Sequence, residues 1–215
     1  MQQDAFFLDA SRSLRDLFES SFVSRTLHAG ETLFEQGDHD DRLYVLDDGV
    51  LEVSVYSSSG RKLSLNLLRA GSVFGEIAMF DPGPRTAHVA AIETSRLRAI
   101  SQATVLRGID QAPELAIELL GFAGKRMRWL SQQVEHQVFL PPAARLAAKV
   151  LHLAGDEGEI TMSQAQLADY VGVTREVVSR TLAEWQRAGL VTQSRGRLCL
   201  LDPAGLAEVK DTKFF

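Results

Sequence analysis

The stretch that decides the fold is residues 74–87, Phe-Gly-Glu-Ile-Ala-Met-Phe-Asp-Pro-Gly-Pro-Arg-Thr-Ala. It places Glu76, Arg85 and Thr86 among glycine and proline residues, which interrupt regular structure. Runs of alternating apolar residues precede it, and a long helical pattern follows it. We therefore expect a loop between strands and a helix, in which a small ligand that carries a phosphate can bind.

Residues 22–100, which surround this stretch, have the pattern of short strands. Apolar residues alternate in three runs, at Leu43 and Val45, at Leu51, Val53 and Val55, and at Leu63, Leu65 and Leu67. Asp48-Gly49 predicts a hairpin between the first two runs, because glycine tolerates positive φ, and Ser59-Gly60 predicts the next turn. Many short strands with regular turns favour a β-roll or barrel.

After residue 104 the pattern becomes helical, and apolar residues recur at heptad spacing. This predicted seam comprises Leu120, Ala123, Met127, Leu130 and Val134. Two interpretations fit: the seam pairs with a second copy of the chain, or it lies on the β domain of its own chain. We prefer the dimer, although apolar spacing alone does not separate the two.

Pro141-Pro142 ends the long helix, because proline lacks a backbone donor. A helix is expected over residues 143–154, with Gly155 as its C-terminal cap. Ser163 and Gln166 have the spacing of a capping box, Gly172 supplies a turn, and Thr174 can cap a second helix. With the hairpin expected after residue 189, this predicts a winged helix-turn-helix.

The second helix of this unit begins with polar residues that share one face by helical geometry. They are Arg175, Glu176, Ser179 and Arg180. Such residues can read base edges in the major groove, Arg on guanine and Glu on cytosine. We predict that they contact DNA together with Ser163, Gln164 and Thr174, and that Arg195 and Arg197 touch phosphate. The alternative is an ordinary solvated helix face.

Composition limits the function classes. The chain has 215 residues and a formal net charge of −5, so DNA binding must come from a local patch. We expect an α+β protein with divisions at residues 1–110, 111–140 and 141–215. The single cysteine, Cys199, cannot form an internal disulfide or a metal cage, and no nucleophile–base pair or metal-ligand spacing suggests an enzyme. Without a signal peptide or a membrane span, we expect a cytoplasmic protein.

The opening loop suits a cyclic phosphodiester attached to a ribose. Arg85 can donate charge-assisted hydrogen bonds to phosphate, Thr86 adds a hydroxyl, and Glu76 can accept from the ribose 2′-hydroxyl. Backbone N–H groups of residues 75–78 can add donors. The alternative is a structural Glu76–Arg85 salt bridge that closes the loop without any ligand.

Here the residues resemble a known family. Phe-Gly-Glu-Ile-Ala followed by Pro-Arg-Thr-Ala is similar to the phosphate-binding cassette of cyclic-nucleotide domains. With the long helix and the sequence from Arg175 to Arg180, residues 22–201 resemble the bacterial family of the cyclic-AMP receptor protein and the fumarate-nitrate regulator. This resemblance implies a homodimeric transcription regulator, with RNA polymerase as a further partner and recognition helices reoriented by the nucleotide.

The resemblance also implies roles for single residues. Glu76 would hold the ribose, and Arg85 and Thr86 the phosphate. Close backbone approach would come from Gly75, Ile77 and Ala78, and Arg126 and Ser131 would lie near the base.

The sequence departs from the family at two positions, where Leu130 replaces the usual Thr and Thr86 the usual Ser. We place cyclic AMP ahead of cyclic GMP and expect palindromic sites with TGA in each half. A haem or redox sensor and a ligand-independent regulator of this fold remain alternatives.

Overall fold

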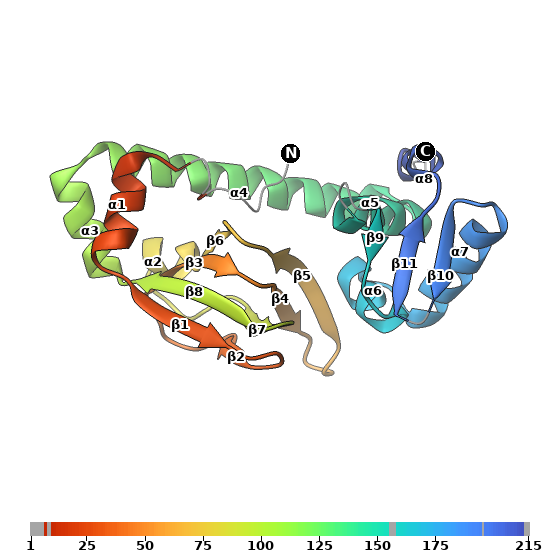
Figure 1. The fold of residues 1–215 in the computed structure, drawn as a ribbon, viewed down its shortest axis with the longest axis horizontal. Helices are drawn as coiled ribbons and strands as arrows, with labels where there is room; N and C mark the ends of the chain where they lie inside the picture. Colours follow the sequence, from red (N-terminus) through yellow and green to blue (C-terminus); the bar gives the residue numbers. More distant parts are fainter. Residues whose placement is uncertain (1–6, 8–9, 155–157, 195, 213–215) are drawn as a thin grey trace. The chain divides into compact units, whose positions relative to one another are not determined.

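The computed structural model describes residues 7, 10–154, 158–194 and 196–212 (Figure 1). Its contacts divide the chain into two compact units. The first contains residues 1–60 and 65–128, and the second contains residues 61–64 and 129–215. The division falls inside one long helix, so the three-part division expected from the sequence stays a prediction.

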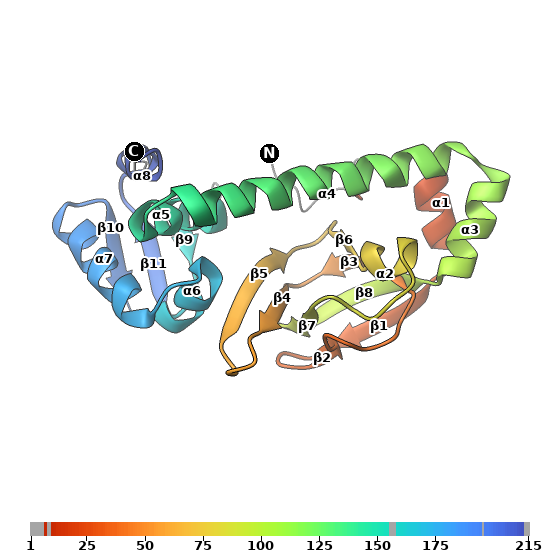
Figure 2. The same ribbon diagram turned by 180° about the vertical axis from the view of Figure 1, so that it is seen from behind.

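Two four-stranded antiparallel sheets form most of the first unit, with strand orders β1-β8-β3-β6 and β2-β7-β4-β5 (Figure 2). Their strands are β1 (Val23–Leu27), β2 (Thr32–Phe34), β3 (Leu43–Asp48), β4 (Leu51–Tyr56), β5 (Lys62–Leu68), β6 (Val73–Phe74), β7 (His88–Ala91) and β8 (Ser95–Ile100). Helix α1 (Arg12–Ser20) precedes the strands, α2 (Glu76–Phe80) lies between β6 and β7, and α3 (Gln102–Gln111) follows β8. The predicted β-roll is confirmed.

The hairpin expected at Asp48-Gly49 is wrong. β3 pairs with β6 and β8, whereas β4 pairs with β7 in the other sheet, so the chain crosses between sheets here. Gly49 has a φ of +94°, and a Cβ atom there would lie 2.3 Å from Ser95 Oγ. The dipeptide therefore makes a turn that packs closely on β8, and the following strand, β4, pairs in the other sheet. The Ser59-Gly60 turn does join neighbouring strands, β4 and β5.

Two hydrophobic clusters lie among the described residues of the first unit, and β3 contributes to both. Tyr44 and Leu46 pack in the cluster between the sheets, whereas Leu43 and Val45 pack with residues of the helices. Covering on both faces explains why the first four residues of β3 are all buried. Apolar residues of β3 thus connect the sheets to the helical layer.

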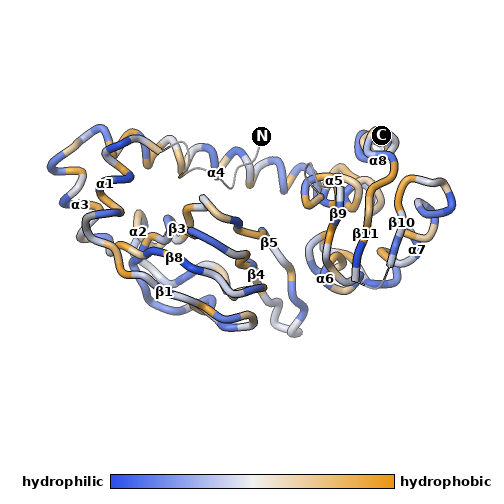
Figure 3. Tube along the Cα trace, in the orientation of Figure 1, coloured by the Kyte–Doolittle hydropathy of each residue, from blue (hydrophilic) through white to orange (hydrophobic). Residues whose placement is uncertain are grey.

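The long helix, α4, runs over Glu114–Phe139 and belongs to both units. Leu115, Leu119 and Phe122, spaced four and three residues apart, are its buried residues and pack in the cluster that contains Leu43 and Val45. Along α4 the chain alternates between hydrophilic and hydrophobic residues (Figure 3). A second stripe of apolar residues, with Leu120, Met127 and Val134, is exposed to solvent.

The second unit is a winged helix-turn-helix, as predicted. Its elements are α5 (Pro142–Ala154), β9 (Glu159–Ile160), α6 (Gln164–Val171), α7 (Arg175–Arg187), β10 (Val191–Ser194), β11 (Arg197–Leu200) and α8 (Pro203–Lys210). The capping box of Ser163 and Gln166 is present, Gly172 has a φ of +76°, and Thr174 accepts from the Val177 N–H. The expected cap at Gly155 lies outside the described residues.

Candidate functional site

The loop of residues 74–87 begins where β6 ends, and Gly75 starts α2 in the left-handed conformation. A Cβ atom at Gly75 would lie 2.7 Å from the Arg42 carbonyl oxygen and 2.8 Å from Arg85 Nη1. Side chains at this φ of +89° are strained even without such contacts. Glycine is therefore required here, because the Arg85 side chain passes directly against the backbone.

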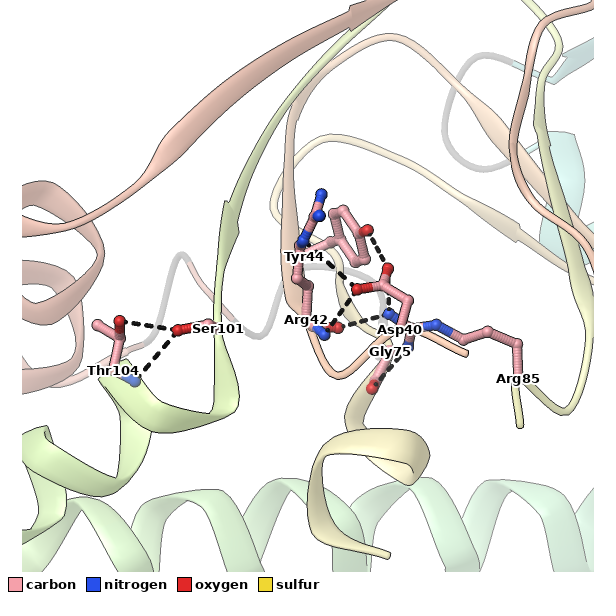
Figure 4. A network of polar contacts seen from close by, with 7 residues as sticks. All are labelled: Asp40, Arg42, Tyr44, Gly75, Arg85, Ser101 and Thr104. Carbon is pink, nitrogen blue, oxygen red and sulfur yellow. Dashed lines mark hydrogen bonds and ion pairs between the residues drawn. The ribbon is translucent and has the colours of Figure 1, made fainter. Parts of the chain in front are cut away.

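The Arg85 side chain is only 3% exposed, and three hydrogen bonds hold its guanidinium (Figure 4). Nη1 donates to the Gly75 carbonyl at 3.0 Å, and Nη2 donates to Asp40 Oδ2 and to the Arg42 carbonyl, both at 2.8 Å. Nε is buried and has no hydrogen-bond partner among the described residues. The Nε–H of this buried cation thus makes no hydrogen bond within the described part of the chain.

Aromatic rings complete the surroundings of this guanidinium. Its central carbon lies 4.3 Å from the centre of the Phe34 ring and 5.5 Å from that of Tyr44. Tyr44 in turn stacks on Phe74, with ring centres 5.2 Å apart. Cation–π attraction strengthens when water is excluded, so these rings help to retain the charge in the buried site.

The sequence alone does not indicate a role for Asp40. It precedes Arg85 by 45 residues, and the run from Asp38 to Asp41 has the appearance of a solvated acidic turn. In the structure its Oδ2 also accepts from the Tyr44 hydroxyl at 2.5 Å. Burial raises the pKa of Tyr44 to about 12, and the hydrogen bond to Asp40 adds to this.

Burial opposes ionisation of Asp40, but hydrogen bonds from Tyr44 and Arg85 outweigh it and leave the pKa of Asp40 below its ordinary value. The carboxylate is therefore charged at neutral pH. Backbone contacts hold the two loops together: Arg85 N–H donates to the Asp38 carbonyl at 2.7 Å, and Gly37 N–H donates to the Arg85 carbonyl at 2.9 Å. Asp40 and Arg85 are thus fixed opposite each other.

Glu76 is 7% exposed and faces a different cation from the one expected. Its Oε1 lies 3.8 Å from Arg126 Nε on α4. The alternative of a Glu76–Arg85 salt bridge is therefore not the arrangement in this structure, because Arg85 pairs with Asp40. The Glu76–Arg126 pair links the cassette to the long helix inside the first unit.

Seven of the eight predicted ligand-binding residues line one small cavity. These are Gly75, Glu76, Ile77, Ala78, Arg85, Thr86 and Arg126. The eighth, Ser131, is an exposed residue in the part of α4 that belongs to the second unit. The cavity measures about 60 Å³, whereas small-molecule sites usually span ~300 Å³ or more.

The predicted DNA-reading residues share the outer face of α7. Arg175, Glu176, Ser179 and Arg180 are all exposed, while Val178, Leu182 and Trp185 are buried. Hydrogen bonds at the start of the helix, from its backbone first and then from Thr174, lower the pKa of Glu176. The face therefore presents two guanidiniums, a hydroxyl and an ionised carboxylate together.

Three further predicted contacts already have partners inside the unit. Ser163 serves the capping box, and the Gln164 amide donates to Gln193 Oε1 of β10 at 3.0 Å. In the wing, Arg197 pairs with Glu159 at 3.1 Å and remains 61% exposed. Arg195 lies outside the described residues. A groove of about 480 Å³ runs between α6, α7 and the wing, lined in part by Ser163, Gln164 and Arg197.

The predicted seam on α4 is largely uncovered in the single chain. Leu120, Met127 and Val134 are 63%, 68% and 64% exposed. Leu130 is also exposed, and Ala123 is partly buried. The residues that pack on the chain's own β domain are instead Leu115, Leu119 and Phe122. The seam is therefore not the face by which α4 lies on that domain.

Among the described residues, no group of three or more His, Cys, Asp and Glu side chains could hold a metal ion. In the same part of the chain, none of the helices is both long and apolar enough to cross a membrane.

A β domain with a small buried site, joined by a long helix to a winged helix-turn-helix, defines a ligand-binding, DNA-binding regulator. Residues 24–112 match the cyclic nucleotide-binding domain, and residues 144–209 match the Crp-like helix-turn-helix domain. The chain belongs to the Crp/Fnr family of transcription regulators.

Several relatives can be aligned with most of this chain. The CRP-like cAMP-activated global transcriptional regulator of Mycobacterium tuberculosis is 28% identical and covers 83% of this chain and 84% of its own. The cyclic AMP receptor protein of Thermus thermophilus is 29% identical, over 90% and 91%. A solved CRP/FNR-family transcriptional regulator, TTHA1359 from Thermus thermophilus, has a TM-score of 0.76 and 25% identity, covering 89% of this chain and all of its own.

Proposed function

We propose that this regulator is controlled by a cyclic mononucleotide, cyclic AMP ahead of cyclic GMP, bound at the cavity beside Arg85. The observation that carries this proposal is the buried guanidinium with its unpartnered Nε in a cavity that Glu76 and Thr86 also line. A phosphate oxygen would satisfy that N–H, and the ribose hydroxyl would donate to Glu76. The cAMP-activated relatives support the same ligand class.

The size of the cavity suggests how binding becomes a signal. A cavity of about 60 Å³ is smaller than the usual small-molecule site, so nucleotide binding would move the groups around it. Glu76, which would bind the ribose, also pairs with Arg126 of α4. Ligand binding would alter this pair and shift α4 relative to the cassette, because a hydrogen bond from the ribose would reorient the Glu76 carboxylate that Arg126 meets.

The output would be DNA binding by a homodimer. The exposed seam on α4 would join two chains, and each α7 would enter the major groove with Arg175, Glu176, Ser179 and Arg180. Two recognition helices related by a two-fold axis read half-sites about one helical turn apart. We propose a palindrome with TGA in each half, and action in the cytoplasm together with RNA polymerase.

Titrating both nucleotides in a DNA-binding assay tests this function. We expect cyclic AMP, and more weakly cyclic GMP, to raise the affinity for a palindromic promoter fragment at least tenfold. Calorimetry on the same protein reports binding without DNA. If neither nucleotide produced heat and neither changed the DNA affinity, the effector assignment would be wrong, while the DNA-binding assignment would stand on its own.

A further inference from the structure

The guanidinium of Arg85 has five N–H donors, and the structure shows where three of them go. Nη1 and Nη2 donate to two backbone carbonyls and to Asp40 Oδ2. All three hydrogen bonds are made by the terminal nitrogens, Nη1 and Nη2. Nε, which is nearest the aliphatic stem, is buried without a partner among the described residues.

A buried cation requires a counter-ion. Arg85 is 3% exposed, and a charge left unpaired at such depth is strongly destabilising, because it has lost its hydration without compensation. Asp40 is the acidic group that meets it, at 2.8 Å. Without Asp40, the Arg85 side chain would be more stable in water than in the site.

Asp40 is itself held on both oxygens. Oδ2 accepts from the Tyr44 hydroxyl and from Arg85 Nη2. Oδ1 accepts from the Arg42 N–H at 3.2 Å. Tyr44 belongs to the buried core, where it is 1% exposed. The carboxylate is therefore fixed by Tyr44 of the β3 framework, and the half-exposed Arg42 guanidinium adds a longer ion pair, with Nε 3.4 Å from Oδ1.

We propose that Asp40, held by Tyr44, is the positioning residue of the phosphate site: it keeps Arg85 folded into the cassette with Nε–H free for a phosphate oxygen. The inference deepens the proposed function and rests on it. It assigns no ligand contact to Asp40. Its effect is pre-organisation, because a ligand then binds without first recovering the guanidinium from solvent.

The opposite role is that Asp40 competes with phosphate for Arg85. The geometry does not support competition, because Asp40 accepts from Nη2 and leaves Nε without a hydrogen-bond partner among the described residues. The two roles predict opposite signs. Removing a positioning carboxylate weakens the binding of an anionic ligand, whereas removing a competitor strengthens it.

The test compares cyclic AMP with adenosine, which keeps the base and ribose but has no phosphate. In Asp40→Ala we expect cyclic AMP to bind at least tenfold more weakly and adenosine to bind as in the parent protein. Asp40→Asn should lie between, since its amide oxygen can still accept from Nη2. The matched control is Asp41→Ala, an exposed neighbouring carboxylate that should change neither affinity.

A merely structural role would weaken both ligands equally, and that result would overturn the proposal. Tighter cyclic AMP binding in Asp40→Ala would overturn it in favour of competition. If Asp40→Ala failed to fold, Asp40→Asn and Tyr44→Phe would carry the same comparison, with the smaller loss expected for Tyr44→Phe, which keeps the ion pair.

Tyrosinate absorbance gives a reading without nucleotide. Tyr44 should titrate near its pKa of about 12 in the parent and at lower pH in Asp40→Asn, because the carboxylate acceptor is gone. If the parent protein bound no cyclic nucleotide, the proposed function would fail and the positioning role would fail with it. A normal parent with unchanged affinities in all Asp40 variants would sink the positioning role alone.

Discussion

Gly75 and Arg85 depend on each other at the scale of single residues. The positive φ at Gly75 brings its carbonyl to Arg85 Nη1, and the missing side chain leaves room for the guanidinium. Neither residue can be exchanged without disturbing the other. The glycine of the Phe-Gly-Glu sequence thus has a role in packing, in addition to the backbone approach to a ligand that we propose for it.

Gly75→Ala should therefore destabilise the first unit by ~1–3 kcal/mol, through positive-φ strain and contact with Arg85. Nucleotide binding should weaken as well. Urea unfolding and calorimetry measure the two effects. Gly83→Ala is the matched control in the same loop, because a Cβ atom there would meet nothing closer than 3.8 Å. Equal stability of the two variants would contradict the packing argument.

Lys149 carries a second residue-scale prediction, on pH. Its Nζ donates to Gln133 at 2.7 Å and lies 4.4 Å from the centre of the Tyr170 ring, and burial lowers the pKa of Lys149 to about 8. Below pH 8 both the folded and unfolded states hold the proton. Between about pH 8 and 10.5 the unfolded state holds more, so the free energy of unfolding should rise with pH.

Relative to Lys149→Met, the parent should gain about 1–2 kcal/mol of unfolding free energy between about pH 7.5 and about pH 9.5, after allowance for partial exposure. Urea titrations of both proteins at the two pH values measure this difference. A constant difference across this range would show that Lys149 keeps an ordinary pKa in the folded protein.

At the scale of elements, α4 has two apolar stripes with different partners. Leu115, Leu119 and Phe122 face the helical core, and the seam of Leu120, Met127 and Val134 faces away from it. Heptad spacing in the sequence detects the second stripe, but not which stripe packs internally. A long helix can show both patterns at once, because its two faces overlap in sequence.

Met127→Glu should separate the proposed dimer, since it places a charge in the middle of the seam. We expect the mass measured by light scattering to fall toward that of one chain at micromolar concentration. DNA affinity should fall with it. Gln132→Glu, which adds the same charge to an exposed position outside the seam, is the control. A dimer that survived Met127→Glu would place the interface elsewhere.

At the scale of the whole molecule, we propose that the first unit senses the nucleotide and the second reads DNA, so a variant in the first unit should remove only the nucleotide-dependent part of DNA binding. Arg85→Leu should lose nucleotide-dependent DNA binding at least tenfold while the fold survives, because Leu fills the apolar surroundings but offers no donor. Mobility shifts with and without cyclic AMP measure this. An unchanged nucleotide response in the variant would refute coupling through the cassette.

Arg180→Ala makes the reciprocal prediction. Arg180 is exposed on α7, so its removal should leave stability within about 0.5 kcal/mol. DNA affinity should fall by about 1–3 kcal/mol, the usual cost of one base-reading contact. Calorimetry should still show normal nucleotide binding. Selective binding to the promoter by this variant would show that Arg180 does not read bases.

The sequence by itself determined the order of the parts, the β-roll, the long helix and the winged helix-turn-helix. Capping residues, turn glycines and apolar periodicity encode these features, and each acts over a few neighbouring residues. The sequence also grouped residues that the fold brings together, because seven of the eight predicted ligand-binding residues line one cavity, while their binding of a ligand stays a prediction.

Only the tertiary structure decided the ionic partners and the strand pairing. It pairs Arg85 with Asp40, 45 residues away, and Glu76 with Arg126, and it sends β3 and β4 to different sheets. Local sequence cannot decide these points, because an acidic turn looks solvated until another loop packs on it. A buried charge pairs with whichever opposite charge the fold places beside it.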